Sequence, residues 1–280
     1  LRLLLFNLAT DADDPVLGFT TAWINALAPH CEYIDVLTMR AGRLAVAGNV
    51  RVFSVGKEKG YSEGRRAFEF YRILPGLLLR RRYDACFAHM QQIFALMAAP
   101  LLKLWRVPIT LWYTHKATPR SLYWAEKVVD RIVTASPESF RLPSRKVRVI
   151  GHGIDTERFS PAPNAPADLF TLVSAGRIAP VKRLETLIDT LHRLYYELGW
   201  GEVRLRLVGS AAENDRQYAD HLRELVQTLD IERLVTFVGA VAYDDMAREY
   251  QQADVMINLS QTGSLDKAVL EAMACGLPVI

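Results

Sequence analysis

The chain has 280 residues, half of them apolar, and a formal net charge of +3. A chain of this length and composition can bury one large core or two ordinary ones, as globular proteins do. No apolar run reaches the ~18 residues that a membrane-spanning helix needs, so the sequence argues against a transmembrane protein.

Short apolar runs alternate with stretches of helical periodicity through the first 160 residues. Strands and helices that alternate at this spacing are typical of βαβ units around a parallel sheet. We expect strands at Arg2–Leu8, Tyr33–Leu37, Val50–Val55, Ala85–His89, Ile109–Tyr113, Arg131–Thr134 and Val147–Ile150, and helices at Phe19–Leu27, Gly64–Arg81, Gln92–Trp105 and Arg120–Val129.

A proline-rich stretch, FSPAPNAPADL at residues 159–169, then interrupts the pattern and is typical of a linker. The alternation resumes after it. We therefore predict an α/β protein with two Rossmann-like domains, at 1–160 and 170–280, joined by a linker at 161–169. The second domain should contain strands Thr171–Ala175, Arg204–Val208, Val235–Val238, Val255–Leu259 and Leu277–Ile280, and helices Leu184–Leu198, Arg216–Leu229, Tyr243–Gln252 and Leu265–Cys275.

No element follows the strand predicted at Leu277–Ile280. Parallel strands are normally covered on both faces. We therefore expect that the native chain continues past Ile280 and that the second domain is incomplete here.

Positive charge is concentrated in the first half. Residues 1–165 hold 23 Lys and Arg against 14 Asp and Glu, and the remaining residues hold 11 against 17. The basic residues Lys57, Lys59, Arg65, Arg66 and Arg80–Arg82 form either a solvated helix face or a surface for anionic lipid headgroups or a phosphate-bearing acceptor. No aromatic-plus-basic stacking motif accompanies them, which argues against nucleic acid as a partner.

The three cysteines, Cys31, Cys86 and Cys275, lack metal-binding or redox spacing. We interpret them as core thiols in a reducing compartment. The expected location is the cytoplasm, with peripheral contact at the inner face of a membrane as a further hypothesis.

The stretch SAGRIAPVKRLETLI, residues 174–188, places Arg177 and Lys182 between a strand and a helix. A helix N-terminus with two cations can bind a diphosphate through free N–H groups and charge-assisted hydrogen bonds. The alternative is that both cations are solvated surface residues.

Two histidines also follow predicted strands. His115, in LWYTHKATPRS, lies just past a carboxyl strand end, where ligands of parallel sheets bind. His152, in VIGHGIDTERFSP, lies between Gly151 and Gly153 and is more typical of a hydrogen-bonded structural residue.

The last stretch, SQTGSLDKAVLEAMACGLPVI at residues 260–280, combines a turn with a helix. Thr262 or Ser264 can cap that helix, and Gly263 eases the turn. Glu271 lies among residues that look buried, and a buried carboxylate needs a partner.

Several common motifs are absent. The chain has no G-x-G-x-x-G after its first strand, no P-loop, no nucleophile elbow and no H-E-x-x-H. No D-x-D sits at a predicted strand end. We therefore expect neither a metal nor a cofactor.

Taken together, the motifs resemble the retaining glycosyltransferases of the GT-B fold, family 4 or group 1, which transfer a sugar from a nucleotide diphosphate donor. The resemblance covers Lys146–Ile280 in the order KVRVIGHGIDTERFSP, GRIAPVKRLETLI, LRLVG, VTFVGAV, ADVMINLSQTG and LEAMACGLPVI. In residues 1–145 it rests on strand order, WYTHK and DRIVTASPESF. It implies two domains that face an inter-domain cleft.

The resemblance also implies roles for particular residues. Arg177 and Lys182 match the pair that holds the donor diphosphate, and Glu271 matches the second Glu of an E-x7-E motif, which binds the donor ribose. His115 matches a histidine near the donor sugar. Gly18 matches a glycine-rich loop after the first strand, where family members commonly have two glycines and this chain has one.

The chain departs from the family at Gly263, which stands where the first motif Glu contacts the transferred sugar. Asp266 either reaches the sugar, orients Lys267 or serves the helix N-terminus. Lys267 either helps to hold the diphosphate or serves the same helix end. With Gly263 and Ser264 of the turn, these residues complete the expected donor site.

The resemblance implies a metal-independent retaining transfer from a nucleotide sugar to a glycan or lipid-linked acceptor. The leaving-group charge would fall on Arg177, Lys182 and helix N-termini. Two alternatives stay open: a non-catalytic nucleotide-sugar-binding or scaffolding subunit, and a GT-B-fold sugar-nucleotide epimerase.

Overall fold

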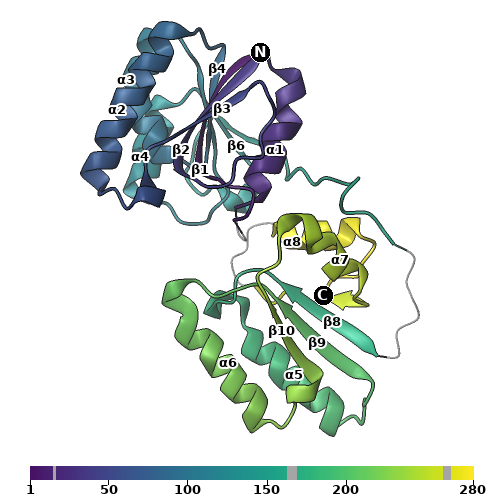
Figure 1. The fold of residues 1–280 in the computed structure, drawn as a ribbon. Helices are drawn as coiled ribbons and strands as arrows, with labels where there is room; N and C mark the ends of the chain where they lie inside the picture. Colours follow the sequence, from purple (N-terminus) through teal and green to yellow (C-terminus); the bar gives the residue numbers. More distant parts are fainter. Residues whose placement is uncertain (15–16, 163–168, 261–265) are drawn as a thin grey trace. The chain divides into compact units, whose positions relative to one another are not determined.

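The structure is a computed structural model, and it describes residues 1–14, 17–162, 169–260 and 266–280. The chain forms two compact units, Leu1–Gly151 and His152–Ile280. Each unit has its own parallel sheet with helices packed against it (Figure 1).

The first unit is built on a seven-stranded sheet with the order β3-β2-β1-β4-β5-β6-β7. Every neighbouring pair in it is parallel. The chain moves outward from β1 to β3 and then returns to β4, so β1 and β4 flank a topological switch point. The strands are β1 (Arg2–Thr10), β2 (Tyr33–Ala41), β3 (Val50–Ser54), β4 (Ala85–His89), β5 (Ile109–Trp112), β6 (Arg131–Thr134) and β7 (Val147–Val149).

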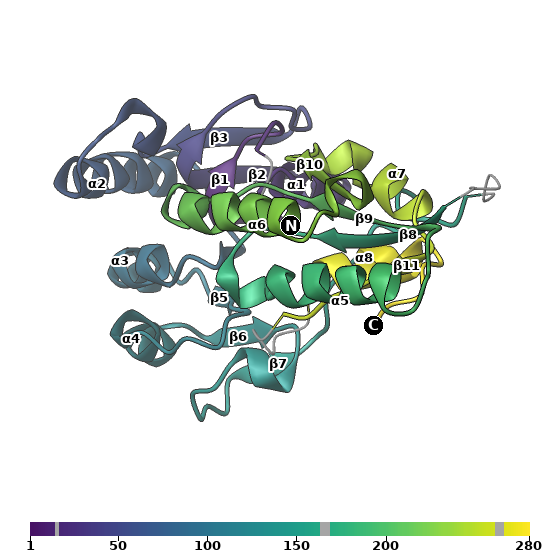
Figure 2. The same cartoon turned by 90° about the horizontal axis from the view of Figure 1, so that it is seen from below.

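Helices cover both faces of this sheet. One face carries α1, and the other carries a layer of three helices, α2, α3 and α4 (Figures 1 and 2). Right-handed crossovers require this division, because the chain reverses its direction across the sheet after β3. The helices are α1 (Phe19–Leu27), α2 (Glu63–Arg80), α3 (Gln92–Leu104) and α4 (Arg120–Val128).

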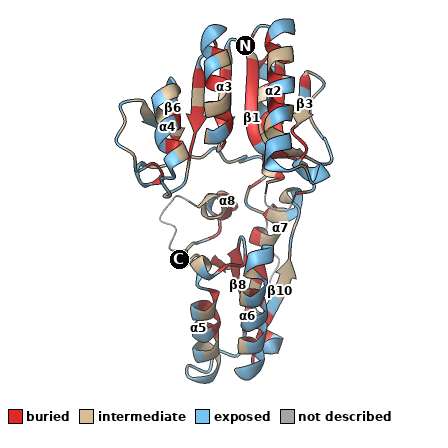
Figure 3. Ribbon diagram, turned by 90° about the vertical axis from the view of Figure 1, so that its left-hand side faces the viewer, coloured by how far each residue is buried: buried red, intermediate tan, exposed pale blue. Residues whose placement is uncertain are grey.

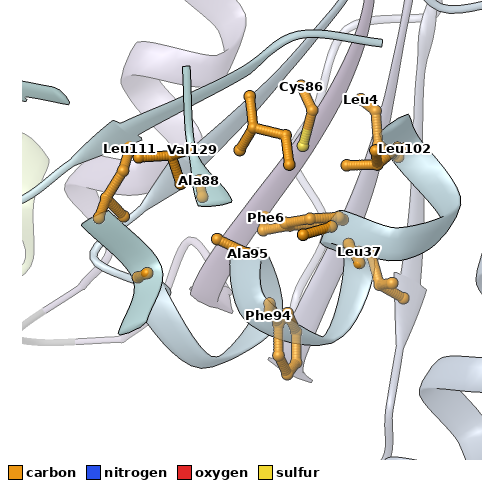
Figure 4. Packing of buried hydrophobic residues seen from close by; sticks show 14 of the residues in the cluster. Leu4, Phe6, Leu37, Cys86, Ala88, Phe94, Ala95, Leu102, Leu111 and Val129 are labelled. Carbon is orange, nitrogen blue, oxygen red and sulfur yellow. The ribbon is translucent and has the colours of Figure 1, made fainter. Parts of the chain in front are cut away.

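The main core of the first unit lies between the sheet and the three-helix layer (Figure 4). The Phe6 ring from β1 lies 5.8 Å from that of Phe70 in α2 and 5.9 Å from that of Phe94 in α3. Leu3–Phe6 of β1 are all buried, as expected for a central strand of a parallel sheet covered on both faces.

The second unit contains a four-stranded parallel sheet with the order β10-β9-β8-β11. One apolar cluster packs the sheet against α5 and α6, and a second packs it against α7 and α8. The elements are β8 (Phe170–Ala175), α5 (Leu184–Tyr196), β9 (Val203–Val208), α6 (Arg216–Thr228), β10 (Val235–Gly239), α7 (Met246–Gln251), β11 (Val255–Met256) and α8 (Lys267–Ala274).

Three predicted elements of the second unit differ from the structure. The strand predicted at Val255–Leu259 is only the two-residue β11, and Leu277–Ile280 forms a single bridge, Met256 to Val279, rather than a strand. The helix predicted at Tyr243–Gln252 begins with a 3₁₀ turn, Tyr243–Asp245, before α7. The pairing is short because β11 has only two residues. Met256 bonds both sides of Val279, through the Pro278 carbonyl and the Ile280 N–H, each at 2.9 Å.

Within the described ranges, no helix is both long and apolar enough to cross a bilayer. Cys31, Cys86 and Cys275 are buried free thiols. Burial raises the pKa of the Cys86 thiol well above its usual value.

Candidate functional site

Three glycines end three adjacent strands of the second unit. Gly176 follows β8, Gly209 follows β9 and Gly239 ends β10, and each has positive φ, which favours glycine. The Gly209 N–H donates to the Gly239 carbonyl at 2.8 Å. A Cβ on Gly209 would lie 1.9 Å from the Gly176 carbonyl oxygen, so the loops after β8 and β9 approach closely only because no side chain is present.

Arg177 and Lys182 lie on the loop that follows Gly176. The loop passes through a 3₁₀ turn, Pro180–Lys182, and reaches α5 through Arg183, which is left-handed at φ 50°. The Arg177 guanidinium is half exposed, with its Nε 3.7 Å from Oδ2 of Asp215. Lys182 is largely buried and forms an ion pair with Asp266, 84 residues away in sequence.

Asp266 is the N-cap of α8. Its Oδ1 accepts a hydrogen bond from the Ala268 N–H at 3.4 Å, and its Oδ2 accepts one from Lys182. The prediction that Thr262 or Ser264 caps this helix is therefore wrong, because the helix begins at Lys267 and Asp266 has the extended backbone of an N-cap. Gly263 and Ser264, both named as donor-site residues from sequence, lie outside the described residues.

Glu271 is buried one turn further along α8, with 6% of its surface exposed. Its Oε1 lies 3.1 Å from the Lys267 Nζ, and its Oε2 accepts a hydrogen bond from the Tyr250 hydroxyl at 3.3 Å. Burial raises the pKa of Glu271, and the charge of Lys267 opposes that rise. The carboxylate thus has the partners that its burial requires.

Lys267 is held in the same group of side chains. Its Nζ donates to the Tyr243 hydroxyl at 3.1 Å and lies 4.4 Å from the Tyr243 ring centre, a cation–π distance. Burial lowers the pKa of Lys267, while Glu271 favours its charged form. Burial also raises the pKa of the Tyr243 phenol.

These side chains lie at the carboxyl edge of the second sheet, beside its switch point between β8 and β11. Two ion pairs meet at the start of α8: Lys182 with Asp266, and Lys267 with Glu271. The structure therefore brings together four of the residues named from sequence. Arg177, the fifth named residue of this unit in the described ranges, has Asp215 as its ion-pair partner.

A pocket of about 330 Å³ opens beside this edge, on the side of α6. The loop residues Gly209–Ala211 and the Phe237 ring line it, together with Arg216 and Arg223 of α6. Arg223 is already engaged, because its guanidinium bonds Asp220 at 2.8 Å and lies 5.4 Å from the Phe237 ring centre.

Gly18 and His115 both belong to the first unit. Gly18 is the residue before α1, and a Cβ there would lie 2.7 Å from the Asp14 carbonyl oxygen, so the turn after β1 leaves no room for a side chain. His115 is exposed on the loop after β5. Its Nδ1 accepts from the Ala117 N–H at 3.0 Å, which leaves the proton of the neutral ring on Nε2.

No group of three or more His, Cys, Asp or Glu side chains within the described ranges is arranged to hold a metal ion. The cations at the carboxyl edge of the second sheet are lysine and arginine, which can bind an anion directly.

Sequence reasoning did not identify Tyr243, Tyr250 or Asp215 as site residues. Each of these residues lies 21 to 38 positions from its partner in the sequence, so only the fold brings the two together. Tyr243 and Tyr250 offered no more of a signal than a pair of tyrosines before α8, and such a pair is equally typical of a core. Asp155 and Phe159, near the start of the second unit, form a turn and a fully buried ring.

Comparison with known proteins gives consistent results for the second unit. Residues 170–280 match the family described as "Glycosyl transferases group 1". The D-inositol 3-phosphate glycosyltransferase of Kineococcus radiotolerans is 35% identical over 146 residues, which cover 48% of this chain and 34% of that protein. The chain spans 32% to 63% of the length of the curated relatives that it matches.

Solved structures share the fold over the whole chain. Sucrose-phosphate synthase from Thermosynechococcus elongatus has a TM-score of 0.80 at 18% identity, covering 99% of this chain and 80% of that one. Anabaena HepE in complex with UDP has a TM-score of 0.76 at 19% identity, covering 100% and 80%. The predicted α/β fold with two parallel sheets is confirmed.

Proposed function

We propose that the protein transfers a sugar from a nucleoside diphosphate donor to an acceptor, because residues 170–280 match the group 1 glycosyltransferases and the chain shares the fold of solved glycosyltransferases. One observation carries the proposal. Lys182, Lys267 and Glu271 are held together at the carboxyl edge of the second sheet, next to the loop that carries Arg177.

The donor diphosphate would bind Arg177 and Lys182. In transfer, the leaving nucleoside diphosphate gains negative charge, and positioned cations stabilise that charge. Two lysine or arginine groups and the N-terminus of α8 can do this without a metal. We propose that configuration at the anomeric carbon is retained, with the leaving phosphate helping to deprotonate the acceptor.

The donor ribose would bind Glu271. Its carboxylate is already buried and bonded to Lys267 and Tyr250. Hydroxyl groups of a ribose can replace the Tyr250 hydrogen bond without leaving the charge unpaired, because Lys267 stays on the other oxygen.

Asp266 would exchange partners when the donor binds. Its carboxylate holds Lys182 in an ion pair, and a diphosphate carries more negative charge than one carboxylate. A bound diphosphate therefore competes with Asp266 for Lys182. Asp266 keeps its place because it also caps α8.

The acceptor would bind the first unit, at the carboxyl ends of β1 and β5. His115, which the family resemblance assigns to the donor sugar, presents Nε2–H on the loop after β5 and can donate a hydrogen bond to a sugar oxygen. We propose a glycan or a lipid-linked acceptor. A lipid-linked acceptor would bring the protein to an anionic membrane surface, and the positive charge of residues 1–165 supports this.

Binding of UDP tests the donor site. Removing a charge-assisted hydrogen bond costs about 1.5–3 kcal/mol, so Arg177→Ala and Lys182→Ala should each weaken UDP binding roughly 10- to 100-fold in calorimetry. Arg193→Ala, an exposed arginine on α5 of the same unit, is the matched control and should bind as the unchanged protein does. Equal affinity in all three variants would contradict the diphosphate assignment.

A second candidate is a nucleotide-sugar-binding subunit without transferase activity. Gly263 favours it, since this residue stands where the first glutamate of the family motif contacts the transferred sugar. The two candidates differ in turnover. If nucleotide sugars bind but no sugar is transferred or hydrolysed across a donor and acceptor panel, the binding subunit is the better description.

A further inference from the structure

Each helix of the three-helix layer of the first unit has large apolar side chains that are exposed. On α2, Phe68, Tyr71 and Leu79 are exposed, and Leu79 is 75% exposed. These residues follow a spacing of three and eight, which places them on one stripe of the helix. The buried residues of α2, which include Phe70 and Leu74, lie on the neighbouring side that faces the sheet.

The next helix repeats this arrangement. On α3, Ile93 and Leu104 are exposed and eleven residues apart, which again is one stripe, and Leu104 is 73% exposed. The Trp105 ring follows at the helix end and is partly exposed. Figure 3 shows exposed stretches along the outer sides of α2 and α3.

The third helix adds two aromatic rings. Tyr123 and Trp124 of α4 are exposed, and Trp124 is 60% exposed. The Lys127 ammonium lies 5.2 Å from the Tyr123 ring centre. Aromatic side chains beside a cation are typical of the boundary between water and lipid, where one end of the side chain is apolar and the other is hydrated.

The three helices are neighbours, so their stripes form one surface. The Tyr71 hydroxyl donates to the Met97 carbonyl at 3.3 Å and joins α2 to α3. The Gln92 amide donates to the Ser121 hydroxyl at 3.5 Å and joins α3 to α4. Figures 1 and 2 show α2, α3 and α4 side by side over one face of the sheet. We call this surface the outer helical face.

The charge of the outer helical face is strongly positive. Residues 63–82, 92–106 and 120–128 hold ten Lys and Arg against three acidic residues, Glu63, Glu69 and Glu126. All three acids are engaged, Glu63 with Arg66 at 3.7 Å, Glu69 with Arg72 at 2.6 Å and Glu126 with Lys127 at 3.2 Å. Exposed basic residues, among them Arg80, Arg82 and Lys103, therefore surround the exposed apolar side chains.

We infer that the outer helical face binds an anionic lipid surface, with the aromatic and leucine side chains entering the headgroup region and the arginines and lysines contacting lipid phosphates. Apolar burial and basic charge together are what interfacial binding needs, since either one alone is weak. A second copy of the chain is a poorer occupant. A two-fold interface would place this face on itself and bring like charges together.

This inference deepens the proposed peripheral contact with a membrane and does not depend on transferase activity. Sedimentation with vesicles tests it. The chain should bind vesicles of phosphatidylcholine mixed with phosphatidylglycerol and should bind pure phosphatidylcholine much less. Raising the salt from ~0.1 M to ~1 M shortens the screening length from about 10 Å to about 3 Å and should release the protein.

Two sets of variants separate the apolar and the charged contributions. The triple variant Leu79→Ser, Leu104→Ser and Trp124→Ser should weaken vesicle binding at least tenfold. The double variant Arg80→Glu and Lys103→Glu should weaken it about fivefold or more for each side chain changed. The matched controls are Leu198→Ser with Trp200→Ser, and Arg193→Glu, which change exposed residues of the second unit. The controls should sediment as the unchanged chain does.

The readouts distinguish failure of this inference from failure of the proposed function. UDP binding, measured on every variant, should be unchanged, which also shows that the variants are folded. Binding that ignores lipid charge and salt, or apolar variants that sediment like their controls, would overturn the inference. A concentration-dependent dimer lost in the same apolar variants, without vesicle binding, would assign the outer helical face to a second copy instead.

Discussion

At the scale of single residues, Asp266 combines two contacts in one side chain. One of its carboxylate oxygens caps α8 and the other holds Lys182. The cap is one of the three roles that the sequence left open for Asp266, and the ion pair with Lys182 was not among them. The two contacts can be separated by substitution, because an asparagine caps helices about as well as an aspartate.

Asp266→Asn should keep the cap and release Lys182. We expect UDP to bind about 3- to 10-fold more tightly, since the diphosphate no longer competes with a carboxylate for the ammonium. Calorimetry with UDP measures this. Asp266→Ala is the companion variant and should in addition lower the free energy of unfolding by about 1 kcal/mol through loss of the cap. Weaker UDP binding by Asp266→Asn would show that the carboxylate supports the nucleotide rather than competing with it.

At the scale of elements, α2 has two faces with different roles. Phe70 is fully buried, with its ring 4.8 Å from that of Phe94, whereas Phe68, two residues earlier, is exposed. The same residue type therefore occurs in two environments on one helix. The two phenylalanines of α2 therefore test directly what burial of a phenylalanine ring contributes to the free energy of unfolding.

Phe70→Ala should lower the free energy of unfolding by about 3–5 kcal/mol, because it removes apolar burial and leaves a cavity. Phe68→Ala should change it by no more than about 0.5 kcal/mol, as exposed substitutions usually do. Urea unfolding of the two variants checks this. Similar losses for both would mean that the exposed stripe of α2 is covered by protein.

Much of the element order could be predicted, since it depends on local patterns. The helices Phe19–Leu27 and Arg120–Val128 and the strands Ala85–His89 and Arg131–Thr134 are bounded by turn residues and show clear periodicity, and their predicted ends agree with the structure to within one residue. The start of α8 was predicted two residues early, because Ser, Thr and Asp all cap helices and only the fold selects Asp266. The short β11 depends on pairing with β8, which no local pattern contains.

The site was predictable where it depends on spacing along the chain. Arg177 and Lys182 lie on one loop, and Lys267 and Glu271 lie one helical turn apart, so sequence alone places each pair. The contacts between Lys182 and Asp266 and between Arg177 and Asp215 could not be predicted. They join different loops, and their partners follow from the parallel order of β8, β9 and β11.

At the scale of the whole molecule, the chain consists of two compact units with separate cores. The named donor residues, Arg177, Lys182, Lys267 and Glu271, belong to the second unit. Gly18 and His115 belong to the first. The residues that the sequence names for the site are therefore carried by both units.

Hydrogen exchange should resolve the two units in the intact chain. Saturating UDP stabilises whatever binds it, by about 2.7 kcal/mol at a hundredfold excess over Kd. We expect slower exchange in residues 170–280, above all around Gly176–Lys182 and the start of α8, and little change in β1–β3. Protection centred on the first unit would place the nucleotide elsewhere. The Lys182→Ala variant, at the same UDP concentration, is the control.

The three glycines that end β8, β9 and β10 affect which residues of the site can be substituted during evolution. Because a side chain at Gly209 would collide with Gly176, the backbone alone fixes how closely the loops after β8 and β9 approach each other. The charged residues beside these loops, such as Lys182 and Asp266, can then be exchanged one by one without changing the backbone. We therefore expect relatives of this protein to differ in the charged residues that contact the ligand. Gly209→Ala should not be tolerated, because its added methyl group would collide with the Gly176 carbonyl.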